Sequence, residues 1–120
     1  MSNPLRGEAT LAAGGIAYTL VYDINALCMA QEAVDVDIDV LLEEVERGKR
    51  LSIIRALLWA GLARRHSCSL LDAGDIMTAA GVKATAEAVR GGLVAAFPAA
   101  VEDAAPANPP PPAAGTSSAG

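Results

Sequence analysis

Alternating apolar and polar positions around a Gly-Gly pair predict a β-hairpin near the start of the chain. Gly14-Gly15 can form a two-residue turn in which both residues take positive φ. Side chains alternate along a strand, so one face of the hairpin collects the more apolar residues Ala9, Leu11, Ala13, Ile16, Tyr18, Leu20 and Tyr22. Two strands alone are only marginally stable in water. We therefore expect the face of Leu11, Tyr18 and Leu20 to pack on helices, with both strand edges open unless another segment pairs with them.

Apolar residues then recur at helical spacing, which predicts about five helices between Ile24 and Phe97. The residues expected to face inward are Leu27, Ala30 and Val34, then Ile38, Leu41, Leu42 and Val45, then Ile54, Leu57, Leu58, Gly61 and Leu62, then Ala73, Ile76, Met77 and Ala80, and finally Val82, Ala86, Val89, Leu93 and Phe97. The predicted fold class is α+β, mostly α, with the N-terminal hairpin packed on a small helical bundle.

Polar residues and glycines mark the expected ends of these helices. Asp23 or Asn25 can cap the first helix, and Ser52 can cap the third. Gly48 suits a left-handed stop, and the segment from Ser69 to Asp72 has the pattern of a capping box. We expect fraying or a kink at Gly91-Gly92, because a Gly costs a helix about 1 kcal/mol relative to Ala.

The third helix is uncharged almost all round, and Arg55 is its only charge before Arg64. Such a helix either lies at the centre of its bundle or is covered by another chain. We favour the central position. The other interpretation makes a candidate partner-binding surface of Trp59, Ala56, Ala60, Arg64 and Arg65.

The composition changes after Phe97. Residues 98–120 contain most of the prolines and no large apolar side chain beyond Val101. Such a segment buries too little apolar surface to offset the entropy lost on ordering. We therefore expect a hairpin-plus-helix domain over residues 1–97 and a disordered Ala/Pro-rich tail over residues 98–120.

Charge and cysteine content narrow the class of protein. The net charge is −5 and the pI is about 4.7, which argues against a duplex-DNA binder because such proteins need a basic surface. Two cysteines without a secretory leader fit a reducing compartment. No apolar run reaches the roughly 18 residues that a membrane span needs. We expect a soluble, cytoplasmic protein with neither nucleic acid nor membrane as a partner.

An acidic run could hold calcium. Its carboxylates copy four positions of an EF-hand loop, namely Asp35, Asp37, Asp39 and Glu46. The position that needs Gly for the sharp turn is Val40, however, and the helical apolar pattern continues through the supposed loop. Acidic residues at a helix N-terminus are favoured by the helix dipole, which is the simpler explanation.

Two further groups of residues have a functional and a structural interpretation. His66 and Cys68, with Cys28, could supply metal ligands or a Cys–His pair, but no CxxC or HExxH spacing supports this. A basic face could dock an acidic or helical partner, or it could be ordinary solvated surface; its residues are Arg47, Lys49, Arg50, Arg64, Arg65 and His66. We expect no catalysis and no cofactor.

Several segments resemble one protein family from Asn3 to Phe97. These are NPLRGEATL, YTLVYDINALC, RALLWAGL, LDAGDIM and AAFP. They resemble the tail assembly chaperones of the gene-transfer-agent and long-tailed phage type, which are sometimes labelled as tail tube proteins. The chain departs from that pattern at Met29 to Glu32 and in the stretch VDVDID.

The resemblance implies a non-catalytic helper in the bacterial host cell. Such chaperones coat the helical tape-measure protein and recruit tail tube subunits, which then displace them. An open strand edge could also support a homo-oligomer. Two alternatives stay open: a structural tail protein that remains in the particle, and a small regulatory or nucleic-acid-binding helical module.

Overall fold

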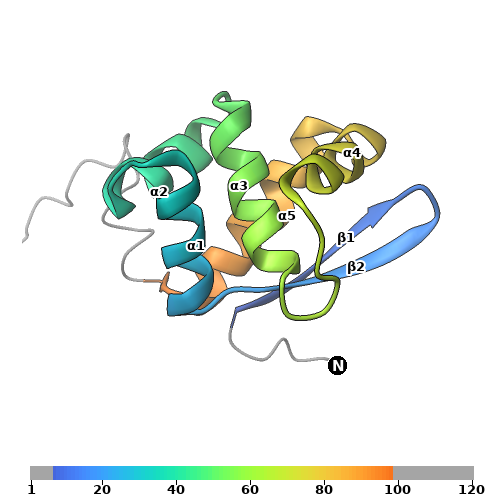
Figure 1. Cartoon of the computed structure of the whole chain (residues 1–120), viewed down its shortest axis with the longest axis horizontal. Helices are drawn as coiled ribbons and strands as arrows, with labels where there is room; N and C mark the ends of the chain where they lie inside the picture. The colour runs from blue at the N-terminus through green and yellow to red at the C-terminus, as the bar shows by residue number, and fades with distance from the viewer. Residues whose placement is uncertain (1–6, 99–120) are drawn as a thin grey trace, which may run out of the picture.

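Two strands and five helices follow one another along the chain in the computed structural model, which describes residues 7–98 (Figure 1). The elements are β1 (Glu8–Ala13), β2 (Ile16–Val21), α1 (Ile24–Val34), α2 (Ile38–Arg47), α3 (Leu51–Leu62), α4 (Leu70–Ala80) and α5 (Val82–Ala96). This confirms the predicted fold of an N-terminal hairpin packed on five helices. The disordered tail predicted over residues 98–120 lies, except for Pro98, outside the described residues.

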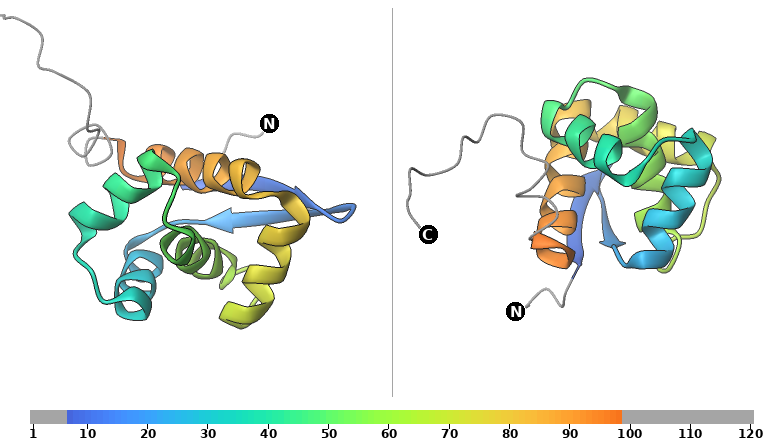
Figure 2. Two further views of the ribbon diagram at one scale, coloured as in Figure 1. Left: turned by 90° about the horizontal axis from the view of Figure 1, so that it is seen from above. Right: turned by 90° about the vertical axis from the view of Figure 1, so that its left-hand side faces the viewer.

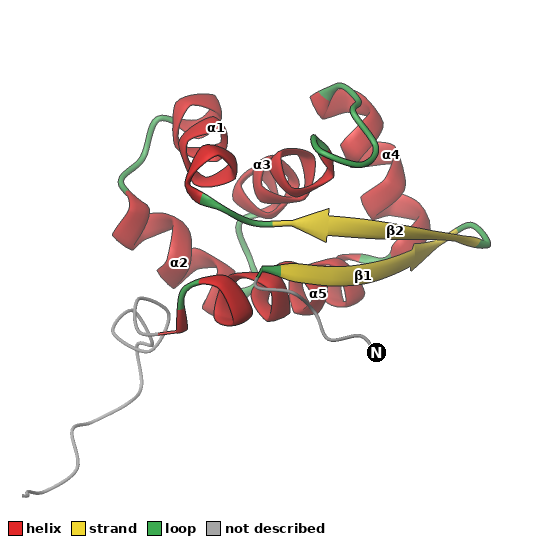
Figure 3. Ribbon diagram, turned by 90° about the horizontal axis from the view of Figure 1, so that it is seen from below, coloured by secondary structure: helices red, strands yellow, loops and turns green. Residues whose placement is uncertain are grey.

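The helices form one layer and the hairpin forms the other. Both strands cross in front of α3 and α5, with α1 and α4 on either side of α3 (Figure 3). Most side chains of α3 are buried, namely Ile53, Ile54, Ala56, Leu57, Leu58, Ala60 and Leu62. The central position favoured for this helix is therefore confirmed, and it explains why α3 is apolar on nearly every side.

The hairpin has the predicted turn and register. Gly14 and Gly15 have φ angles of 58° and 82°, and Leu11 faces Tyr18 across the two strands. Leu11 and Leu20 are buried against the helices, whereas Tyr18 is only half-buried. The tip of the hairpin extends past the helices (Figure 2), so Ile16 is exposed and not covered as its place on the apolar face suggested.

Most predicted helix ends are confirmed. The Ala26 N–H donates to the Asp23 carboxylate over 2.9 Å, and Gly48 is left-handed with a φ of 68°. Ser69 and Asp72 form both hydrogen bonds of the capping box. The cap predicted at Ser52 is wrong, because the extended residue before α3 is Arg50, and Ser52 already lies in the first turn.

The interior of α5 also differs from the prediction. The helix continues without interruption through Gly91 and Gly92. Its buried residues are Thr85, Val89, Gly92 and Leu93, whereas Val82, expected to face inward, is exposed. The inner face is rotated toward Gly92 because the ring of Tyr22 needs the space beside that glycine.

Tyr22 connects the hairpin to two helices. Its hydroxyl donates to the Leu57 carbonyl of α3 over 2.8 Å, and its own N–H donates to the Gly7 carbonyl over 2.8 Å. A Cβ at Gly61 would lie 2.6 Å from the ring, and one at Gly92 would lie 2.5 Å from it. Both distances are far below van der Waals contact, so the buried ring fits only because these positions lack side chains.

Neighbouring glycines of α5 should respond oppositely to the same substitution. Gly92→Ala should lower the free energy of unfolding by about 2 kcal/mol, because the added methyl overlaps the Tyr22 ring. Gly91→Ala should raise it by about 0.5–1 kcal/mol, because the space beside Gly91 is open and Ala is the better helix former. Chemical denaturation followed by circular dichroism measures both. Equal stability of the two variants would disprove the packing described for Tyr22.

Tyr22 should also make the fold sensitive to alkali. Burial raises the pKa of the Tyr22 phenol far above its usual range, whereas in the unfolded chain the phenol ionises near pH 10. The stabilising effect of the neutral phenol is therefore complete below about pH 10 and is lost as the pH rises above it, by up to about 1.4 kcal/mol per pH unit.

Tyr22→Phe provides the comparison for this alkaline loss. It should cost about 1 kcal/mol at neutral pH through the lost hydrogen bond to the Leu57 carbonyl. Its unfolding free energy should fall less steeply above pH 10 than that of the unchanged chain, measured by urea titration at a series of pH values. Parallel pH curves would rule out the burial of an un-ionised phenol.

Candidate functional site

The five residues of the predicted partner-binding surface do not share one exposed face. Ala56 and Ala60 are each 1% exposed and belong to the core. Trp59 is half-buried, and its Nε1–H donates to the Cys68 carbonyl over 2.9 Å. Arg64 and Arg65 are exposed and follow the end of α3. The two alanines therefore offer no surface here, and a contact role for the other three residues stays a prediction.

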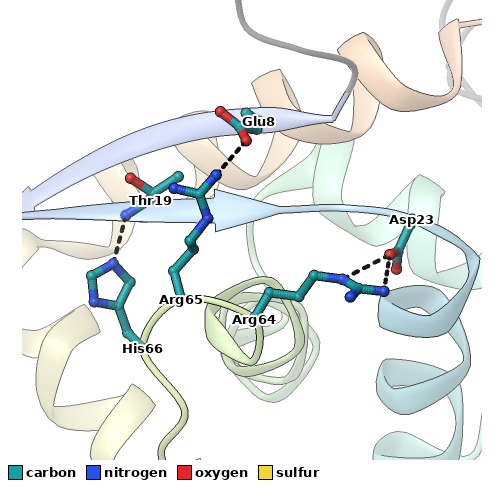
Figure 4. A network of polar contacts seen from close by, with 6 residues as sticks. All are labelled: Glu8, Thr19, Asp23, Arg64, Arg65 and His66. Carbon is teal, nitrogen blue, oxygen red and sulfur yellow. Dashed lines mark hydrogen bonds and ion pairs between the residues drawn. The ribbon is translucent and has the colours of Figure 1, made fainter.

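The segment after α3 is bound to the hairpin by polar contacts (Figure 4). Arg65 pairs with Glu8 of β1 over 2.9 Å. The Thr19 N–H of β2 donates to Nε2 of His66 over 3.1 Å, and the His66 ring meets the Tyr18 ring edge-on at 5.1 Å. An outward-pointing amide of β2 is thus already paired, so the expectation that both hairpin edges are open fails at Thr19.

Arg64 adds a further contact beyond the end of β2 (Figure 4). It pairs with the Asp23 carboxylate at 2.7 Å. The Ala26 N–H, followed by Arg64, lowers the pKa of Asp23 below its usual value. The carboxylate thus caps α1 and binds the end of α3 at once.

The expected basic face is divided between the two ends of α3. Arg47 is the last residue of α2, and Lys49 and Arg50 lie on the connection that enters α3. The other group, Arg64 to His66, follows its last residue, Leu62. Twelve helical residues span about 18 Å, so the two groups are too far apart to act as one patch.

The acidic residues considered as metal ligands lie at helix ends or in an ion pair. Asp35 ends α1 in a left-handed conformation and Asp37 is the N-cap of α2, while Glu46 pairs with Arg90 over 2.7 Å. Burial, and then the charge of Asp72, raise the pKa of the Cys68 thiol, which disfavours the thiolate that a metal binds. Within residues 7–98, no three His, Cys, Asp or Glu side chains are placed to hold a metal ion.

A groove that the sequence did not predict lies where α3 and α5 begin, beside α4. Its volume is about 350 Å³. We call it the Arg55 groove; its lining residues are Leu51, Ser52, Arg55, Gly74, Met77, Thr78 and Val82. Leu51 and Val82 are 52% and 38% exposed. Leu71, which is 72% exposed, precedes Gly74 and Thr78 on the same stripe of α4. Of the five large apolar side chains that are exposed within residues 7–98, Leu51 and Val82 line this groove, and Leu71 lies one helical turn before its lining residue Gly74.

The groove also contains a cation that makes no ion pair within residues 7–98. Nε of Arg55 is buried and has no hydrogen-bond partner among residues 7–98. The side-chain stem of Arg55 packs on Gly74, where a Cβ would come within 3.3 Å of its Cδ. A buried donor without a partner costs about 1–3 kcal/mol. The only sequence signal for this site was Arg55 itself, the single charge within an otherwise apolar helix.

The groove entrance is electropositive. Arg50 precedes Leu51 and Lys83 follows Val82. Both α3 and α5 begin there without a side-chain cap, so each presents unsatisfied N–H groups and the positive end of its dipole. Asp75, next to Gly74, is the nearest acidic residue in sequence to the groove lining and is exposed. The groove can thus receive apolar groups together with an anion.

Searches of protein-family models, of curated proteins and of solved structures find no significant match to this chain. None of the helices within residues 7–98 is long and apolar enough to cross a bilayer.

The contact between His66 and β2 can be tested by hydrogen exchange. His66→Phe keeps a ring against Tyr18 but removes the acceptor for the Thr19 amide. That amide should exchange roughly tenfold faster, because its protection depends on this bond. Ser67→Ala, at the exposed neighbouring position, should leave the exchange rate unchanged. Nuclear magnetic resonance measures the rate, and unchanged protection in His66→Phe would contradict the closed edge.

Proposed function

We propose that this chain is a non-catalytic, phage-like tail assembly chaperone that acts in the cytoplasm of the host cell. It binds a helical segment of the tape-measure protein and recruits tail tube subunits. The family is suggested by the resemblance of the sequence. The structural observation in favour is the Arg55 groove, where the lining residues Leu51 and Val82 are left exposed and Leu71 is exposed one helical turn before Gly74.

A groove of this kind suits the apolar face of an amphipathic helix, whose anchors recur every three or four residues. Binding is favoured by the removal of Leu51, Leu71 and Val82 from water, which contributes about 25 cal/mol for each Å² of apolar surface buried. Three rim side chains give a contact of modest size, well below that of a permanent interface. Such a complex can dissociate when tube subunits arrive, as a chaperone requires.

A structural tail protein is the second candidate, and the hairpin favours it. The face of the hairpin away from the helices carries the exposed, uncharged residues Thr10, Ala12 and Ala17. The tip carries Ile16 and extends past the helices (Figure 2). A hairpin with such an exposed, uncharged tip could pair with strands of further copies and form a stable oligomer.

Two exposed leucine-sized residues provide a matched test of the chaperone function. Leu71 and Ile24 both lie in the first turn of a helix, are 72% and 64% exposed, and only Leu71 adjoins the groove. Leu71→Asp should lower capture of the tape-measure protein from particle-producing cells at least tenfold, and Ile24→Asp should not. Mass spectrometry of the tagged chain's complexes, with purified particles in parallel, measures this.

The results of this experiment distinguish the chaperone from the structural tail protein. Tape-measure and tube proteins in the capture, with the chain missing from particles, would support the chaperone. Stoichiometric amounts of the chain in the particles would instead support the function of a structural tail protein. Equal loss of capture in both variants would show that the groove is not the contact.

A further inference from the structure

The geometry points to a specific occupant of the Arg55 groove: an amphipathic helix with one Asp or Glu inside its apolar face, whose carboxylate pairs with Arg55. This rests on the proposed function in so far as the tape-measure protein is the source of the helix. The chemistry of recognition follows from the groove itself and applies to any helical partner.

Arg55 differs from the paired arginines of this fold. Arg64, Arg65 and Arg90 are more than half exposed, and each is paired with a carboxylate. Arg55 is half-buried, its Nε is shielded from water, and it makes no ion pair within the described part of the chain. A buried N–H donor normally has a hydrogen-bond partner. The partner of Arg55 is therefore expected from outside these residues.

A carboxylate is the group that fits best. The guanidinium presents its donors as a planar fork that matches two carboxylate oxygens. Arg50, Lys83 and the uncapped starts of α3 and α5 add further positive potential. The rim is apolar at Leu51, Leu71 and Val82, so the acid must come with apolar neighbours. One helix face supplies both, because residues three and four positions apart lie side by side.

Holding Arg55 unpaired should make the free protein less stable than it could be. Arg55→Met keeps the aliphatic stem against Gly74 and removes the guanidinium. The variant should therefore unfold about 4 °C higher than the unchanged chain, while losing its preference for an acidic helix. A gain in stability together with a loss of recognition distinguishes a binding residue from a structural one.

Two synthetic helices of 18 residues test the recognition directly with the full chain. Both carry leucines four positions before and three positions after a central residue, which is Glu in one peptide and Gln in the other. The Glu peptide should bind at least tenfold tighter by titration calorimetry, and Arg55→Met should bind both peptides equally. Arg50→Met, at the entrance, is the control and should keep most of the preference.

Three results would overturn the proposal. These are equal affinity of the two peptides for the unchanged chain, a Glu preference that survives in Arg55→Met, and a lower unfolding temperature for that variant. Absence of binding by either peptide at about 1 mM would exclude a helical occupant.

Two further measurements would detect other occupants of the groove. Tighter peptide binding after the double change Glu102→Gln and Asp103→Asn would assign Arg55 to the chain's own acidic segment and overturn the proposal. A dimer that dissociates in Arg55→Met, detected by sedimentation, would assign it to a second copy and likewise overturn it.

The chaperone function and the carboxylate preference can fail separately. Glu-specific peptide binding without capture of the tape-measure protein would remove the proposed function and leave the specificity of the groove. Equal capture of the tape-measure protein by the unchanged chain and by Arg55→Met would leave the proposed function and remove the carboxylate preference assigned to Arg55.

Discussion

The fold depends on one aromatic ring between two glycines. Tyr22 lies at the end of β2, and its ring occupies the space that side chains at Gly61 of α3 and Gly92 of α5 would need. Its hydroxyl is bonded to the Leu57 carbonyl, so the ring is held by packing and by a directed contact. The next residue, Asp23, caps α1. Two adjacent residues thus fix the hairpin against three helices.

This arrangement determines which parts of α3 lie at the surface of the protein. Because α3 passes through the centre, its apolar residues are used by the hairpin and by the surrounding helices. Within α3 only Leu51 and Ser52 of the first turn are exposed, and Arg55 follows them, half-buried and without a hydrogen bond to Nε among the described residues. The surface that α3 leaves open therefore lies at the rim of the core, beside the Arg55 groove, and not along the back of the helix.

Most local signals in the sequence were reliable, with the cap expected at Ser52 and the kink expected at Gly91-Gly92 as exceptions, whereas contacts between distant segments could not be predicted. The hairpin register follows from Gly14-Gly15 and from strand alternation, and the capping box follows from residues three positions apart. The role of Gly92 depends on a ring 70 positions earlier, which no local pattern encodes. The Arg55 groove joins three helices, so periodicity within each helix could single out Arg55 but could not show what surrounds it.

The arginines at the two ends of α3 differ in whether they form ion pairs within the described residues. At the C-terminal end, Arg64 and Arg65 are paired with carboxylates of the same chain and bind the hairpin to the bundle. Near the N-terminal end, Arg55 makes no ion pair within residues 7–98, although its Nε is removed from water. This difference between Arg55 and the paired arginines is the observation on which the proposed partner contact rests.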